Sequence, residues 1–365
     1  MHRISRFDPH GHAYNEDITP NIIQILLEQN IVSSDRRHTI CVFNPSIAVG
    51  YTSARVIGLK PEATIDPQFT FKNPFQTNIP WNDMVDGTII LNENFFLNFF
   101  PNKVDMRLMQ FGVKIMVIFN EYVSTKIPIK PMYKFSNFPG AKTRVYVELS
   151  SLVGDQIAEP IEYPCAAHAA PIEKNWSMWI ANDDTLHISY SLKPHHVFFK
   201  PDPTSMEKCS VVEDDTSFEF PEHVHISLGT SAVRYDHQNT MLAVGHAKIN
   251  AKDINEGEYS FPVENKAAHP DASRNYKYFM FFYKFNRSTG KILDYSGFFI
   301  PWDGEPHRVF FPTGLDAGPY EFSLAYGVDD SKSNILTLTR NVIESQFNNR
   351  MTTTIHTIPI NHAPK

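Results

Sequence analysis

An acid and a base stand two residues apart where the chain enters an apolar strand. In VDMRLMQFGVKIMVIFN, residues 104–120, Asp105 and Arg107 precede a strand, a turn over Gly112 to Lys114 and a partner strand. Because strand side chains alternate, the two side chains are expected on one face. A carboxyl group there can move a proton, and a neighbouring cation helps to hold it ionised. The plainer interpretation is that the two charges neutralise each other at a sheet edge.

Four further polar stretches stand at the ends of predicted hairpins, near residues 44, 175, 230 and 326. We call these polar hairpin ends, together with that at Asp105, the mouths. The first four mouths, Asp105 included, are spaced by 61, 70 and 55 residues. A four-stranded blade of a β-propeller needs about 40 to 60 residues, so five blades fit the length. The innermost strands would then bring the mouths together at one central pocket. Two stacked β-sandwich domains with unrelated polar turns are the alternative.

The composition favours an all-β fold that positions these residues. Aromatic residues make up 13% of the chain, and there are 26 Pro against 16 Gly, which is typical of many short strands with rigid connections. One helix is predicted over residues 19–30, where apolar residues recur at helical spacing. We therefore expect an N-terminal extension with a short helix over 1–38, a single five-bladed β-propeller over 39–345 and a tail over 346–365.

The charge and the cysteines exclude several classes of function. The net charge of −7 lacks the basic excess of nucleic-acid binding proteins. The three cysteines are far apart, so they predict neither a disulfide framework nor a metal site, and no cofactor is expected. The N-terminal residues lack the apolar core of a signal peptide, and no run is long enough for a membrane span. We expect a cytoplasmic protein.

Five stretches, in this order, resemble signatures of the five-bladed propeller family of mannoside phosphorylases and related β-mannosyl transferases. They cover about residues 40 to 340 and are Phe43-Asn44-Pro45 with Arg55, Val104-Asp105-Met106-Arg107, Glu173-Lys174-Asn175-Trp176, Gly229-Thr230-Ser231 with Val244-Gly245-His246, and Tyr326-Gly327-Val328-Asp329-Asp330. The resemblance implies that Asp105 is the proton donor, acting through a sugar hydroxyl. The family's Glu-Asp-Pro-Arg is Val-Asp-Met-Arg here, and Tyr190-Ser191 replaces a His-Arg pair that grips phosphate. A phosphate clamp is therefore not expected.

The residues of the five mouths receive the following roles. Asp105 and Asp330 are the predicted catalytic pair, because glycosyl transfer uses one carboxyl group for proton movement and often a second. For Asp329 and Asp330 a purely structural turn is an equal alternative, and for Trp176 a place in the core is the more common one. The predicted substrate-binding residues are Asn44, Arg55, Arg107, Lys174, Asn175, Trp176, Thr230, His246 and Asp329.

These residues predict a glycosyltransferase. It would move a hexose, with mannose as the candidate, from a nucleotide sugar or phosphorylated sugar donor to an oligosaccharide or other glycan acceptor. A phosphorylase or hydrolase acting on β-mannosides is the first alternative. A sugar-binding propeller without catalysis is the second, and the retention of both Asp105 and Arg107 argues against it.

Overall fold

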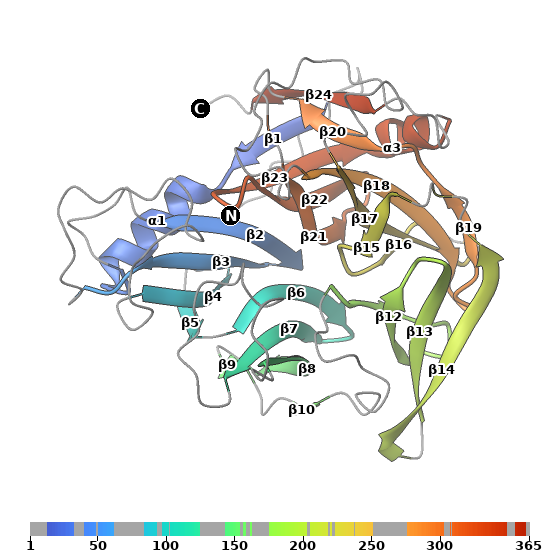
Figure 1. Ribbon diagram of the computed structural model, residues 1–365, viewed down its shortest axis with the longest axis horizontal. Coiled ribbons are helices and arrows are strands. Elements are labelled where there is room, and N and C mark those ends of the chain that lie inside the picture. The colour runs from blue at the N-terminus through green and yellow to red at the C-terminus, as the bar shows by residue number, and fades with distance from the viewer. Residues whose placement is uncertain are drawn as a thin grey trace.

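The computed structural model describes residues 13–32, 40–48, 50–61, 84–92, 97–101, 103–124, 143–153, 156–157, 161–162, 175–202, 205–217, 220, 223–236, 238–250, 276–302, 307, 309–348 and 355–362. This part of the chain is almost entirely β-strand, with two helices. The all-β prediction is confirmed. The sheets surround the middle of the molecule in Figure 1, where the strands β2, β6 and β21 come close to one another.

Three sheets are separate and follow one another along the chain. Each is built from antiparallel strands, and most neighbours within a sheet follow one another along the chain. The first holds β2 (Cys41–Ala48), β3 (Tyr51–Leu59), β4 (Met84–Asn92) and β5 (Leu97–Pro101). The second holds β6 (Lys103–Phe111), β7 (Lys114–Ser124), β8 (Thr143–Val153), β9 (Gln156–Ile157) and β10 (Ile161–Glu162). The third holds β11 (Ser177–Ile180), β12 (Leu186–Ser191), β13 (His195–Asp202) and β14 (Ser205–Ser217).

A fourth, 11-stranded sheet joins two antiparallel groups. One group contains β15 (His225–Leu228), β16 (Val233–Arg234), β17 (Thr240–Asn250), β18 (Tyr276–Asn286), β19 (Ile292–Tyr295) and β20 (Phe299–Trp302). The other contains β21 (Phe310–Ala317), β22 (Glu321–Val328), β23 (Lys332–Thr339) and β1 (Ala13–Asp17). Strand β24 (His356–His362) links them, because it pairs in parallel with both β20 and β1.

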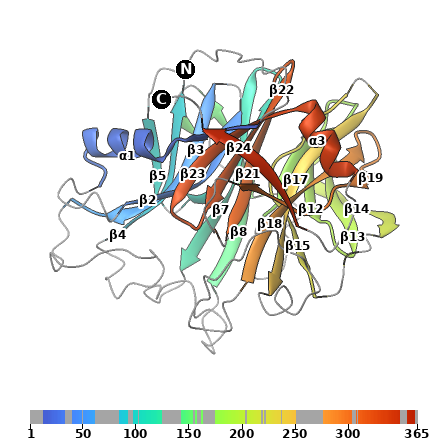
Figure 2. The same ribbon diagram turned by 90° about the horizontal axis from the view of Figure 1, so that it is seen from above.

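Each helix covers one part of the sheets, and Figure 2 shows them at opposite ends of the molecule. Helix α1 (Thr19–Glu28) agrees with the predicted helix over residues 19–30. It buries Ile22 and Leu26 against the apolar face of the first sheet. Helix α3 (Arg340–Phe347) begins at the cap residue Thr339, whose side chain accepts a hydrogen bond from the amide of Val342.

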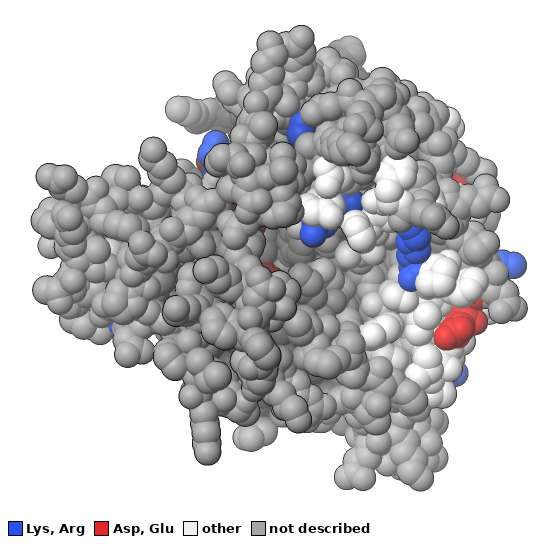
Figure 3. Space-filling view, in the orientation of Figure 1, with Lys and Arg blue, Asp and Glu red and all other residues white. Residues whose placement is uncertain are grey.

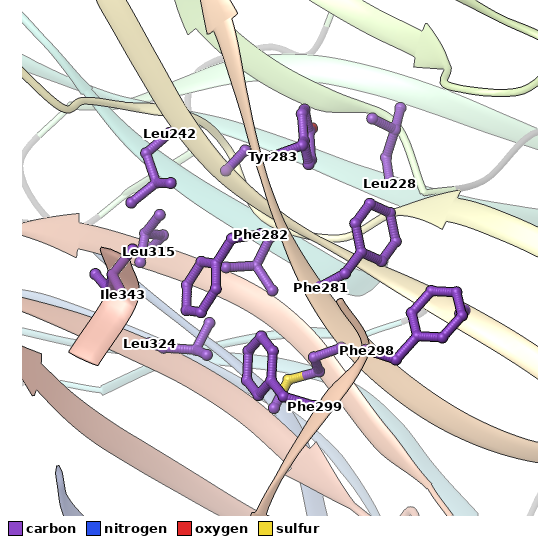
Figure 4. Packing of buried hydrophobic residues seen from close by; sticks show 14 of the residues in the cluster. Leu228, Leu242, Phe281, Phe282, Tyr283, Phe298, Phe299, Leu315, Leu324 and Ile343 are labelled. Atoms are coloured by element: carbon purple, nitrogen blue, oxygen red, sulfur yellow. The ribbon is translucent and has the colours of Figure 1, made fainter. Parts of the chain in front are cut away.

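The largest core lies where β17 and β18 pack against β21 to β23. Strand β18 supplies aromatic side chains to it on both faces, including Phe281, Phe282 and Tyr283, as Figure 4 shows. Phe282 stacks on Phe299 with ring centroids 4.7 Å apart. A strand that is apolar on both faces belongs in the middle of a packed body. This core therefore fixes the strands that carry the last two predicted mouths.

The expected boundaries at 38 and 345 stay predictions, but structure on either side of them belongs to the largest sheet. Strand β1 lies before residue 38 and pairs with β23, and β24 lies after residue 345. Helix α3 spans residue 345 itself. Within the described residues, neither helix is long and apolar enough to cross a membrane.

Candidate active site

The polar residues at four of the five mouths share an unusual backbone conformation. Asn44, Asp105, Asn175 and Asp330 have positive φ angles of 50°, 52°, 65° and 52°. Asn and Asp adopt this left-handed conformation more readily than other residues with a side chain. Non-glycine residues in it cluster at functional sites, where the surrounding structure holds them in place. The sequence contained a signal for these corners, since all four are Asn or Asp.

At two mouths the left-handed residue lies in a β-bulge. The pairing of β2 with β3 shifts between Phe43 and Ser46, and the pairing of β6 with β7 shifts between Val104 and Arg107. Each bulge opposes two residues to one and redirects the side chain at that point. The simple alternation assumed for Asp105 and Arg107 is therefore broken.

The carboxylate of Asp105 is buried and held by two residues of the first sheet. Its Oδ1 accepts a hydrogen bond from Nδ2 of Asn44 at 2.7 Å and lies 3.5 Å from Nη1 of Arg55. The expected pairing with Arg107 takes another form. Nη1 of Arg107 donates to the backbone carbonyl of Asp105 at 3.0 Å, so it holds the bulge rather than the carboxylate.

Arg107 connects three mouths from a fully buried position. Besides the carbonyl of Asp105, its guanidinium donates to the carbonyl of Gly229 and to Oδ1 of Asn175, the latter at 3.3 Å. Burial lowers the pKa of Arg107 to about 10, and the charge of Asp105 opposes that shift. An arginine remains protonated at neutral pH under these conditions. The hydrogen bonds of this charged side chain thus link the second sheet, the entry to the third and the end of β15.

Arg55 forms a bidentate pair with an acid that sequence reasoning missed. Its Nε and Nη2 donate to the two carboxylate oxygens of Asp86 at 3.0 Å and 2.9 Å. Arg55, Asp86 and Asp105 are all buried. The available signal was an acid inside the apolar strand MVDGTIILN, where a charge is retained only with a partner.

Asp330 lies within the electrostatic reach of the same cluster. Its pKa is raised to about 6, chiefly by burial; the positive charge of Arg55 opposes the shift, and the charges of Asp105 and Asp329 add to it. The carboxyl group is crowded by protein atoms, while the residue keeps some contact with solvent. Within the described part of the chain, no hydrogen bond or ion pair engages this carboxyl group. A carboxyl group with a pKa near neutrality is suited to acid–base catalysis.

Asp329 and Thr230 make local structural contacts. Oδ1 of Asp329 accepts the amide of Val309, and Oδ2 lies 2.9 Å from Nδ1 of His307. Thr230 is fully buried, and its amide and hydroxyl both bond the backbone of Val244. These contacts fix the turn after β22 and the end of β15.

Three predicted binding residues lie elsewhere or outside the described residues. Trp176 is buried and packs edge-on against Tyr190 and Phe199, so it belongs to the core rather than to a surface open to a sugar. The ring of His246 lies against Tyr278 and Phe311, with centroids 5.9 Å and 4.6 Å away. Lys174 lies outside the described residues.

The five mouths meet through the contacts of Asn44, Asp105 and Arg107 described above and through two contacts of the last group of strands. The hydroxyl of Thr313 on β21 donates to the carbonyl of Pro45, which brings the last group of strands onto the first sheet. Gly327 leaves room for this approach, because a Cβ there would lie 2.7 Å from Oδ1 of Asn44. Figure 3 shows small areas of acidic surface near the middle of this face. The described residues contain no group of three or more potential metal ligands.

The arrangement provides three acids near the guanidinium of Arg55, namely Asp86, Asp105 and Asp330. Asp105 is held by Asn44 and Arg55, while Asp330 has a raised pKa and no hydrogen bond among the described residues. One group can hold or relay a proton while the other accepts or donates one.

The comparisons with known proteins rest on structure. No family model and no curated protein matches the sequence. β-1,2-Mannobiose phosphorylase from Listeria innocua, solved with β-1,2-mannobiose, is 13% identical with a TM-score of 0.50, covering 85% of this chain and 92% of that one. A second structure comes from a family of mannoside phosphorylases containing glycoside hydrolases that target β-1,2 mannosidic linkages in Candida mannan. It is 11% identical with a TM-score of 0.50, covering 82% and 85%.

A GDP-Man-dependent mannosyltransferase from Leishmania mexicana is also similar, at 9% identity and a TM-score of 0.47, covering 86% and 88%. At identities this low, the likeness to the first two structures establishes the fold alone and leaves the reaction to the site. The structural neighbours are those that the five sequence signatures indicated. In its fold, the chain stands with the mannoside phosphorylases and their relatives.

Proposed function

We propose that the chain is a carbohydrate-active enzyme that transfers a hexosyl group, with Asp105 carrying the proton that the reaction moves. The observation that carries this proposal is the buried carboxylate of Asp105, held by Asn44 and Arg55 within the electrostatic reach of Asp330. Glycosyl transfer passes through an oxocarbenium-like state and needs a carboxyl group to move a proton. A purely structural acid would not require a second, raised-pKa acid beside it.

The first candidate reaction is transfer from a nucleotide sugar to a sugar hydroxyl. Asp330, with a pKa of about 6, would be mostly ionised at neutral pH and able to take the proton of the acceptor hydroxyl, directly or through Asp105. We propose mannose as the hexose, because two solved structures with this fold concern β-1,2-mannosides.

The second candidate is cleavage of a β-mannoside by water or phosphate, and one observation favours the hydrolase form. Arg55 already binds two carboxylates and Arg107 binds two carbonyls and an amide, so both central guanidinium groups are committed to the protein. A diphosphate or an orthophosphate needs cations to stabilise it. Water needs only a base, which Asp330 can provide.

One set of incubations separates these reactions. The protein is given GDP-mannose and other nucleotide sugars with mannose or mannobiose as acceptor, and β-1,2-mannobiose with and without orthophosphate. Release of a free nucleoside diphosphate together with a longer glycan supports the transferase. Mannose alone supports the hydrolase, and mannose 1-phosphate that forms only with orthophosphate supports the phosphorylase. Sugar binding without any product would leave only a non-catalytic role.

Replacing Asp105 by Asn tests the role of the carboxylate. Asn keeps the size, the left-handed backbone preference and one hydrogen-bond acceptor, but it cannot take a proton. We expect turnover to fall about 100- to 10,000-fold while sugar binding persists. Steady-state kinetics and calorimetric titration measure the two quantities, with Asp184→Asn as the surface control. Near-normal turnover in Asp105→Asn would move the chemistry to Asp330.

We further propose that the sheets form a five-bladed propeller. The three separate sheets supply three blades, and the two antiparallel groups joined by β24 supply the fourth and fifth. The contacts of Arg107 with the second, third and fourth of these units support a common axis. An experimental structure in which the five units do not surround one axis would contradict this proposal.

A further inference from the structure

Arg55 lies between two buried carboxylates that belong to different sheets. Asp86, its neighbour in the first sheet, takes two hydrogen bonds from it at 3.0 Å and 2.9 Å, and Asp105 of the second sheet lies 3.5 Å away. The side chain of Asp86 is 4% exposed. A two-point pair holds the plane of a guanidinium far more firmly than a single contact. The closer partner of Arg55 is therefore the acid that lies outside the sequence signatures.

We propose that Asp86 is a positioning residue: it fixes the guanidinium of Arg55 and shares the positive charge that would otherwise act on Asp105 and Asp330 alone. This inference rests on the proposed function only for its effect on turnover. Its structural part, the sharing of charge among three acids, holds for any reaction at this site.

The charges around Asp330 show what this sharing does. The charges that act on it are those of Arg55 from β3, Asp105 from β6 and the adjacent Asp329, while Cys41 from β2 lies close enough for its own pKa to respond to Asp330. Asp330 in turn raises the pKa of Cys41, which burial has already raised, to about 12, so that thiol stays neutral. Arg55 is the cation among these groups, and its positive charge is shared by Asp86, Asp105 and Asp330.

Removing the charge of Asp86 therefore changes the balance in a predictable direction. Arg55 would act more strongly on the two remaining acids, and an opposite charge within about 4–6 Å lowers a carboxyl pKa by about 1 to 3 units. The pKa of Asp330 should fall from its raised value toward the ordinary one. If this group acts as a base, the acid limb of the pH–rate profile moves to lower pH. If it acts as an acid, the alkaline limb does so.

Asp86→Asn tests the proposal, because it keeps the shape and one acceptor while removing the charge. We expect the limb governed by Asp330 to move down by about one pH unit. We also expect kcat to fall about 10- to 100-fold with KM changed less, since Arg55 loses its second anchor. Asp184→Asn removes an exposed acid whose ion pair with Arg287 is on the surface, and its profile should match the unchanged protein.

A second variant separates position from charge. Arg55→Lys keeps the positive charge but cannot form the two-point contact, so kcat should fall while the limb stays within a few tenths of a pH unit. The proposal would be overturned if the Asp330 limb of the pH–rate profile moved in Arg55→Lys but kept its position in Asp86→Asn. If Asp86→Asn does not fold, the Arg55→Lys profile decides alone, and a shift of about one unit overturns the charge-sharing role.

A readout without substrate keeps this test distinct from that of the proposed function. Carbon-13 NMR titration of the aspartate carboxyls, with Asp330→Asn to assign the signal, measures the pKa of Asp330 directly. A lower value in Asp86→Asn supports the charge sharing even if no substrate is turned over, which would defeat the proposed function alone. An unchanged value, with the protein active, overturns the inference alone.

Discussion

Asp330 is a carboxyl group whose surroundings disfavour its charged form. Its pKa is about 6 in the folded protein and about 3.8 in the unfolded chain, so its contribution to stability is fully present below pH 3.8 and is lost as the pH rises through 6. Asp330→Asn removes the charge that burial penalises. We expect this variant to raise the free energy of unfolding at pH 7 by about 1 to 3 kcal/mol.

Urea denaturation at pH 7 and near pH 4 measures this effect. The two proteins should become nearly equal in stability at the lower pH, because both side chains are then neutral. Equal stability at pH 7 would mean that the carboxyl is well solvated and not suited to the proposed role. A stabilised but inactive variant would show that the site is maintained at a cost to the fold.

Asp86 shows why residue-scale prediction was incomplete. The acids and bases at the hairpin mouths were visible in the sequence because they interrupt apolar patterns at regular spacing. Which base meets which acid was not, because the bulge at Asp105 turns its carboxylate to Arg55, some 50 residues earlier. A bulge depends on pairing between strands, and a local pattern contains no information about it.

At the scale of elements, the bulge at Asn44 offers a direct measure of backbone strain. Its amide donates to Asp105, and its φ of 50° suits Asn and Gly better than Ala. Asn44→Ala and Asn44→Gly both remove the hydrogen bond, but only Gly adopts the left-handed conformation at no steric cost. We expect the Ala variant to be about 1 kcal/mol less stable than the Gly variant. Chemical denaturation of the pair measures the difference, and equality would mean that the corner is unstrained.

The third sheet contains two buried histidines that make it sensitive to acid. Burial lowers the pKa of both His187 and His196 to about 4, below the usual 6.5, although nearby Asp183 and the carbonyl of Gly290 respectively oppose the shift. Such a group contributes full stability above pH 6.5, and this is lost as the pH falls toward 4. We expect each histidine to reduce the free energy of unfolding by about 2 kcal/mol between pH 7 and pH 5.

The variant His196→Gln removes one of these titrations. Its stability at pH 7 should be lower, since His196 bonds Ser189 and Gly290, but its loss between pH 7 and pH 5 should be smaller by about 2 kcal/mol. Unfolding curves at intermediate pH values make the comparison. The same slope in both proteins would show that His196 titrates normally.

At the scale of the whole molecule, the all-β class, the helix at Thr19 and the meeting of the mouths followed from composition, spacing and periodicity. The pairing of β1 and β24 did not follow from them. Strands β1 and β24 are short, and each has a neighbour more than 300 residues away or in another group of strands. Local periodicity cannot reveal such pairing, because nothing near either strand in the sequence shows where its partner lies.

The position of β24 also has a consequence for the order in which the protein is made. Strand β1 leaves the ribosome more than 300 residues before either of its neighbours, β23 and β24. Translation proceeds at about 5 to 20 residues per second, so β1 waits tens of seconds for its partners. A nascent chain stopped at residue 350 lacks β24, so the edges of β1 and β20 that pair with it are exposed. We expect protease to cut this chain readily at those two strands. Resistance of that chain equal to the full chain's would show that the largest sheet closes without β24.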